Sequence, residues 1–145
     1  NSIQALERLI YLLPADQKDR VLMDLSLNLN AIIAQRLIPS LDGRYALATE
    51  VLVNSPFSAE VIRKGRMQEL KDIIEKGGAD GMHSFDQSLA ELFKAGKISR
   101  ENALEHASSK NNLEWMLSFD GKAEEKSDRS INSKPVLSGA LPEID

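Results

Sequence analysis

The sequence contains no cysteine, only two histidines and few aromatic residues. Disulfide bonds and thiolate metal sites are therefore excluded, while the redox compartment stays open. Because aromatic residues make up 5% of the chain, a core must be built mainly from Leu, Ile and Val. His83 and His106 have no histidine or cysteine neighbour at ligand spacing, so a zinc site or a His-dependent nucleophile is not expected.

Long hydrophobic runs and an excess of basic residues are also missing. No run approaches the roughly 20 apolar residues of a membrane helix, so no membrane span is expected. The opening NSIQALERLIYLLP lacks the basic start of a signal peptide. Because it begins with Asn, we expect the chain to be processed or part of something longer. The net charge of −4 disfavours nonspecific binding to nucleic acid.

A phosphate-binding loop of the form Gly-x-x-x-x-Gly-Lys-Ser/Thr is absent as well. The chain has two Gly-Lys pairs, and neither is followed by Ser or Thr. We therefore expect this stretch to bind no nucleotide by itself.

Hydrophobic periodicity predicts helices at the start of the chain and a β-hairpin after them. The first helix should end at Pro14, and a longer one should run from Ala15 to Ala34. Residues 35–39 are apolar, 40–43 form an Asp-Gly turn, and 44–53 alternate as a strand. Because a lone hairpin is only marginally stable, it needs helices against it or a larger sheet to join.

Shorter helices are predicted in the second half. Residues 55–64 should form a helix that begins with a Ser-Pro cap, and residues 66–76 a further one. The apolar side of the 55–64 helix should contain Phe57, Val61 and Ile62. Residues 111–119 are expected to dock as a final turn or strap.

The stretch 81–107 carries the clearest helix signals. Ser84 and Gln87 predict a capping box, and Gly96 predicts a left-handed end to that helix. Asp86 is a favourable charge at the helix start. Such a helical pair cannot bury both apolar stripes alone, so the rest of the chain must supply a surface for it.

Glu50 is unusual because it lies in the middle of a predicted strand, where Glu is disfavoured. One interpretation is a solvent-facing or Arg-paired residue. A second is a buried ion pair with Arg44 or Arg63, and catalysis is the least favoured.

From these patterns alone, the chain is a mostly helical interaction module with one hairpin. A stand-alone adaptor that binds a protein partner is one hypothesis, and an upstream reading frame with a phosphate loop would contradict it. Helix-turn-helix DNA binding is another, but its second helix RENALEHA carries two glutamates and one arginine. A gel shift at low salt would test it.

Three segments nevertheless resemble one family. Residues 22–39, 43–52 and 81–107 are similar to the C-terminal part of type IV pilus retraction ATPases, the twitching-motility proteins of the PilT/PilU family. The resemblance covers residues 1–119, and LMDLSLNL lies closer to the PilU branch. Its most specific part is GM-x-S-FDQ-x-L followed by AG-x-IS-x-E-x-AL. The signature residues are Ser84, Phe85, Asp86, Gln87, Gly96 and, in the strand, Glu50.

The resemblance implies a fold and a setting. The fold is mostly α with one β-hairpin: residues 1–54 would end a RecA-like α/β ATPase core, 55–119 would form a helical C-terminal subdomain, and 120–145, rich in charge, Ser, Gly and Pro, would be a disordered tail. Family members are cytoplasmic hexamers of the secretion ATPase superfamily that bind ATP and Mg²⁺ and work with the pilus retraction machinery at the inner membrane. Their nucleotide motifs lie upstream of the matched region.

One family motif falls inside the chain. FSAEVIRK, residues 57–64, is similar to AIRNLIRE, a helix needed for retraction rather than for nucleotide binding. Ile62 and Arg63 match it, whereas Ala59 and Lys64 depart from it. The resemblance implies a motor-coupling role for Ile62 and Arg63. The structural alternative is a core contact for Ile62 and, for Arg63, a surface ion pair contributing less than about 1 kcal/mol.

Overall fold

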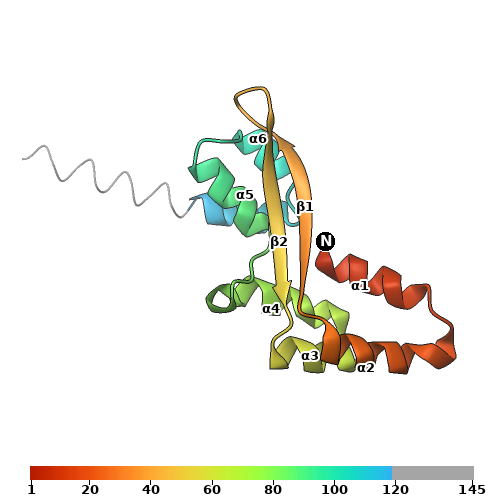
Figure 1. Cartoon of the computed structure of the whole chain (residues 1–145). Coiled ribbons are helices and arrows are strands. Elements are labelled where there is room, and N and C mark those ends of the chain that lie inside the picture. The colour runs from red at the N-terminus through yellow and green to blue at the C-terminus, as the bar shows by residue number, and fades with distance from the viewer. Residues whose placement is uncertain (119–145) are drawn as a thin grey trace, which may run out of the picture.

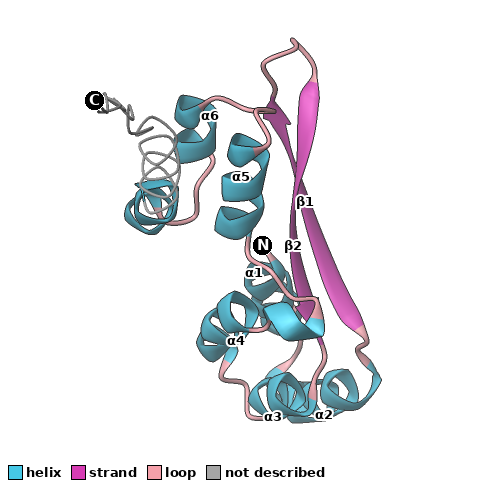
Figure 2. Ribbon diagram, turned by 90° about the vertical axis from the view of Figure 1, so that its left-hand side faces the viewer, coloured by secondary structure: helices cyan, strands magenta, loops and turns pink. Residues whose placement is uncertain are grey.

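The computed structural model describes residues 1–118, and its central feature is a long β-hairpin with helices packed along one face (Figures 1 and 2). The predicted tail at 120–145 lies outside the described residues. In chain order the elements are α1 (Ser2–Tyr11), a 3₁₀ turn (Ala15–Gln17), α2 (Lys18–Asn28), β1 (Ala31–Pro39), β2 (Tyr45–Val53), α3 (Pro56–Arg63), a 3₁₀ turn (Met67–Glu69), α4 (Leu70–Lys76), a 3₁₀ turn (Gly78–Asp80), α5 (Phe85–Lys94) and α6 (Arg100–Glu105). A further helix covers residues 110–118.

The two strands pair antiparallel over their whole length. The register runs from Ala31 opposite Val53 to Pro39 opposite Tyr45. The Ser40 amide donates to the Arg44 carbonyl at 2.9 Å, which closes the turn between the strands. The predicted hairpin and its turn are therefore confirmed.

The predicted helix from Ala15 to Ala34 starts at the expected residue but is wrong at its end. It begins with a 3₁₀ turn, and α2 ends at Asn28. Residues 31–34 belong to β1, because all nine residues of β2 find a partner in that strand. A short apolar run such as AIIA fits a helix face and a strand equally well. Its secondary structure is therefore decided by whether a second strand pairs with it.

The buried apolar side chains gather in two clusters along the hairpin. The base cluster lies at the open end, among α1–α4, and consists of Ile3, Leu6, Leu22, Leu52, Val61, Ile62, Met67, Leu70, Ile73, Ile74 and Met82. The tip cluster lies towards the turn and consists of Ile38, Ala46, Ala48, Phe85, Leu89, Ala90, Ile98, Ala103 and Leu113. Both clusters contain residues from before and after position 54, and the domain boundary expected there stays a prediction.

Two details differ from the sequence-based expectation. Phe57, expected on the buried side of α3, is 66% exposed, whereas Val61 and Ile62 are fully buried. The segment expected as a final turn or strap is helical over residues 110–118 and contributes Leu113 to the tip cluster.

The second face of the hairpin is open. Figure 2 shows the helices on one side of the two strands and none on the other. Four large apolar side chains point to the open side and are exposed: Ile33, Leu37, Tyr45 and Leu47. Leu37 lies directly opposite Leu47, with Tyr45 beside them, whereas the pair of Gln35 and Thr49 separates them from Ile33.

Candidate functional site

The residues singled out from the sequence occupy two places, α3 and the junction between α5 and the hairpin. On α3, Ser55 caps the helix start and Gly65 follows its end with a φ of 68°. Ile62 is fully buried in the base cluster. Arg63, one residue later, points to the surface. Its motor-coupling role is not tested by this geometry and stays a prediction.

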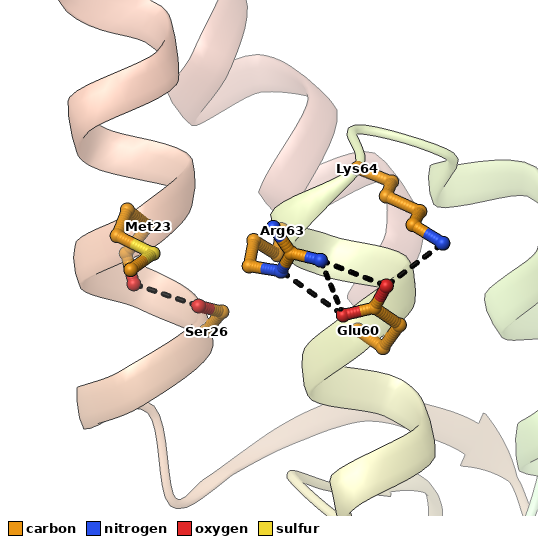
Figure 3. Close-up of polar contacts among 5 residues, drawn as sticks. All are labelled: Met23, Ser26, Glu60, Arg63 and Lys64. Atoms are coloured by element: carbon orange, nitrogen blue, oxygen red, sulfur yellow. Dashed lines mark hydrogen bonds and ion pairs between the residues drawn. The ribbon is translucent and has the colours of Figure 1, made fainter.

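Arg63 belongs to a small ion-pair network on the surface of α3 (Figure 3). Its Nη2 lies 2.8 Å from Glu60 Oε2, and its Nε donates to the same oxygen at 3.0 Å. Lys64 Nζ lies 2.8 Å from Glu60 Oε1. The hydrogen bond from Lys64, and then that from Arg63, lowers the pKa of Glu60 below its ordinary value. All three side chains are solvent-exposed, so the network contributes little to stability.

Helix α2 lies beside this network. Figure 3 shows Met23 and Ser26 on α2 next to the α3 residues. Ser26 Oγ donates to the Met23 carbonyl at 2.7 Å, a bond within its own helix. The end of α2 is tied to the hairpin by Asn54, whose Nδ2 donates to the carbonyls of Ser26 (3.0 Å) and Leu29 (2.8 Å).

Glu50 holds the start of α1 against the hairpin. It is buried, with 6% of its surface exposed, and its Oε1 accepts a hydrogen bond of 2.8 Å from the Ser2 amide. A carboxylate at a helix start is favoured by the helix dipole and by the unpaired amides there. Glu50 is therefore not solvent-facing, and the alternative of an ion pair is wrong too, since Arg44 pairs with Asp42 and Arg63 with Glu60.

Asp86 has a similar function at the start of α5. Its Oδ1 accepts from the Ser108 amide at 2.7 Å, and its Oδ2 accepts from the Ser109 amide at 3.0 Å. These amides lead into the 110–118 helix, whose first turn Ser109 caps. The buried Asp86 therefore joins α5 to the last helix, a contact that its charge at the α5 start did not predict.

The predicted caps of α5 are present. Ser84 Oγ accepts from the Gln87 amide at 3.3 Å, and Gln87 Oε1 accepts from the Ser84 amide at 2.8 Å. Gln87 Nε2 also donates to the Glu75 carbonyl at 3.1 Å, which ties α5 to α4. At the other end Gly96 has a φ of 65°, and the Lys97 amide returns to the Leu92 carbonyl at 3.0 Å, as in a Schellman motif.

Phe85, fully buried in the tip cluster, has a cationic neighbour that sequence analysis missed. The Arg36 guanidinium carbon lies 4.3 Å from the centre of its ring. Arg36 Nη1 also donates to the His106 carbonyl at 3.0 Å. The available signal was a single arginine within the apolar run of β1.

The segment before α5 also extends the sheet by one bridge. His83 and Val51 exchange two backbone hydrogen bonds of 2.9 and 3.2 Å. His83 Nε2 lies 2.8 Å from Thr49 Oγ1, and the Thr49 amide donates to Ser88 Oγ at 3.1 Å. The family signature from Gly81 onward is thus attached along β2.

Glu50 and Asp86 also share a small cavity of about 50 Å³ at the junction between the two clusters. Lys71, Ser84 and Ser108 are among its other lining residues. Its size is enough for only a water molecule or two.

The expectation that this stretch binds no ATP or Mg²⁺ stays a prediction. Within residues 1–118 no group of three or more His, Cys, Asp or Glu side chains is placed to hold a metal ion. No phosphate-binding loop occurs in the sequence either. We therefore assign no step of nucleotide chemistry to these side chains. No helix of the described part is long and apolar enough to cross a membrane.

Comparison with known proteins finds close relatives. The chain is 46% identical over 125 residues to the type IV pilus ATPase PilU of Pseudomonas aeruginosa, covering 86% of this chain and 33% of PilU. It is 32% identical over 113 residues to the type IV pilus retraction ATPase PilT of the same organism, covering 78% of this chain and 33% of PilT. The chain thus spans about a third of the length of these relatives. No protein-family model matches it.

Solved structures agree with this result. The pilus retraction motor PilT with bound ADP superposes with a TM-score of 0.68 at 29% identity, covering 77% of this chain and 31% of that one. The Legionella pneumophila ATPase DotB shares the fold, with a TM-score of 0.59 at 18% identity. The match covers 71% of this chain and 28% of the DotB chain. The observed architecture, helices and one hairpin, is therefore the fold of part of the PilT and DotB structures.

Proposed function

Because the chain belongs to the PilT/PilU family of type IV pilus ATPases, we propose that it forms part of a cytoplasmic, ATP-driven motor that retracts type IV pili. The continuous match to PilU over most of the chain is the observation that supports this function. It is also the stronger of the two pilus matches, in line with the PilU-like LMDLSLNL segment.

Within such a motor the chain would have a mechanical role. It would pack against the ATPase core, form subunit contacts in a hexamer and pass nucleotide-driven movement to the retraction machinery at the inner membrane. The open face of the hairpin supports this role, because Ile33, Leu37 and Leu47 are exposed and require a covering layer. Further elements of a RecA-like domain would supply that layer and join the sheet edge.

ATP and Mg²⁺ would be held by other parts of the motor. We expect no heat of Mg-ATP binding when the 145-residue chain is titrated in a calorimeter, with a relative of full length as the positive control. Binding in the micromolar range by this chain would contradict the proposal.

The motor-coupling role of Arg63 can be separated from its surface ion pair. Arg66 is a matched control, since it forms a comparable exposed i,i+3 pair with Glu69 at 3.1 Å outside the matching residues of the motif. We expect Arg63→Ala to abolish most pilus retraction in cells and Arg66→Ala to leave it near normal, with equal protein levels by immunoblot. Equal retraction in the two variants would assign Arg63 a structural role only.

A further inference from the structure

A groove of about 400 Å³ lies between the start of α3 and the end of α4. Its apolar wall is formed by Phe57, Ile73 and Met82. Ile73 and Met82 are buried, whereas Phe57 remains 66% exposed. Phe57 is therefore the large apolar side chain that an occupant of the groove would remove from water.

The floor of this groove is closely packed. The Gly77 carbonyl accepts hydrogen bonds of 3.0 Å from both the Asp80 and the Met82 amides. A Cβ atom at Gly77 would lie 2.8 Å from the Ile73 carbonyl oxygen and 2.9 Å from Met82 Cβ, so only glycine allows this approach. The floor of the groove is therefore fixed by its own backbone.

The rim of the groove is predominantly acidic. Three carboxylates line it, from Glu69, Asp72 and Asp80, against the single ammonium group of Lys76. Glu69 already pairs with Arg66 at 3.1 Å. Within residues 1–118, Asp72 and Asp80 form no ion pair, and both are exposed. A negative potential therefore remains beside the apolar wall.

We propose that this groove binds a short extended segment of a partner protein, in which a bulky apolar side chain lies next to Lys or Arg. The apolar side chain would pack on Phe57 over the Ile73–Met82 wall. The cation would lie between Asp72 and Asp80. The inference goes beyond the motor function proposed above and does not depend on it, because it rests on the shape, exposure and charge of the groove alone.

Two labelled peptides of equal length test the proposal by fluorescence anisotropy with the complete chain. One alternates Leu with Lys, and the other alternates Leu with Glu. We expect only the Lys peptide to bind. Phe57→Ala and the double change Asp72→Asn with Asp80→Asn should each weaken its binding about fivefold or more. The double variant should also show a smaller loss of affinity with added salt.

Matched controls separate the groove from the general negative charge of the chain. Tyr11→Ala removes another exposed aromatic side chain, and Asp16→Asn with Asp19→Asn removes the same charge elsewhere. Both should stay within about twofold of the parent affinity. Circular dichroism checks that every variant is folded. The proposal fails if the Lys peptide does not bind, or if the control variants weaken its binding as much as the groove variants do. It also fails if sedimentation shows that the chain self-associates and that Phe57→Ala abolishes this self-association.

Discussion

The two ends of the hairpin are built by different means. At the tip, each helix is delimited by its own sequence: Ser84 and Gln87 start α5, Gly96 follows its end, and Ser99 caps α6. At the base, Asn1 and Ser55 cap α1 and α3, but α2 and α4 begin with no side-chain cap. The end of α2 is instead held by Asn54, a residue 25 positions beyond Leu29.

This difference shows where local sequence decides a boundary and where a distant partner does. Capping residues satisfy backbone groups within three or four positions, so they act before any tertiary contact forms. A side chain such as Asn54 can act only after the hairpin has placed it near α2. The tip helices were accordingly predicted at about their true bounds, whereas the helix predicted to end at Ala34 ran four residues into β1.

The largest loss of stability should come from truncating one large buried side chain in each of the two clusters. We expect Phe85→Ala in the tip cluster to cost about 3–5 kcal/mol and Leu70→Ala in the base cluster about 2–5 kcal/mol, because both side chains are fully buried. Both nine-residue strands pass through both clusters, so each change should lower one common transition in urea, followed by circular dichroism and by Trp115 fluorescence.

The exposed Leu41 provides the control for this pair, and Leu41→Ala should shift stability by less than about 0.5 kcal/mol. If Phe85→Ala moved only the Trp115 transition, the two ends would be independent units rather than one cooperative fold.

A smaller effect should come from the polar links that join distant elements. Asp86→Ala would leave the amides of Ser108 and Ser109 without acceptors at a part-buried contact, at a cost of about 1–2 kcal/mol. Asn54→Ala should cost a similar amount at the base, because two carbonyls lose their donor.

Amide hydrogen exchange distinguishes these two changes. Asp86→Ala should accelerate exchange at Ser108 and Ser109 and leave α2 unaffected, while Asn54→Ala should do the reverse. Asp86→Asn keeps one acceptor oxygen, so its exchange rates at Ser108 and Ser109 should fall between those of Asp86→Ala and the parent. Uniform acceleration over the whole chain in either variant would contradict a local role.

The smallest effect on stability should come from one exposed carboxylate at each end of the hairpin. Lys64 and then Arg63 lower the pKa of Glu60 at the base, and the Ser40 hydroxyl, followed by the Arg44 amide, lowers the pKa of Asp42 at the turn. Because both pKa values are below those of the unfolded chain, the contribution to stability is complete above the unfolded pKa and is lost as the pH falls through the folded one.

Carboxyl NMR titration tests the order of these causes. Lys64→Gln should raise the pKa of Glu60 more than Arg63→Gln does, because the Lys64 hydrogen bond is the larger cause. Ser40→Ala should raise the pKa of Asp42 and leave that of Glu60 unchanged. A larger change from Arg63→Gln would show that the bidentate contact dominates instead.

Signature residues illustrate the limits of prediction from sequence. The capping box of Ser84 and Gln87 could be predicted because both partners lie within one turn. The partners of Asp86 could not, since Ser108 lies 22 positions away and has no local pattern that identifies it. Glu50 was recognised as unusual, yet its partner is a backbone amide 48 positions away rather than an arginine.

The sequence by itself determined the helix caps, the hairpin turn, the apolar stripes and the resemblance to pilus ATPases, because these depend on neighbouring residues or on continuous motifs. Only the tertiary structure decided where α2 gives way to β1, which face of the hairpin is covered and which amides the buried carboxylates hold. Those outcomes depend on contacts between residues far apart in the chain. Such contacts acquire a free energy only once the hairpin has brought their partners together.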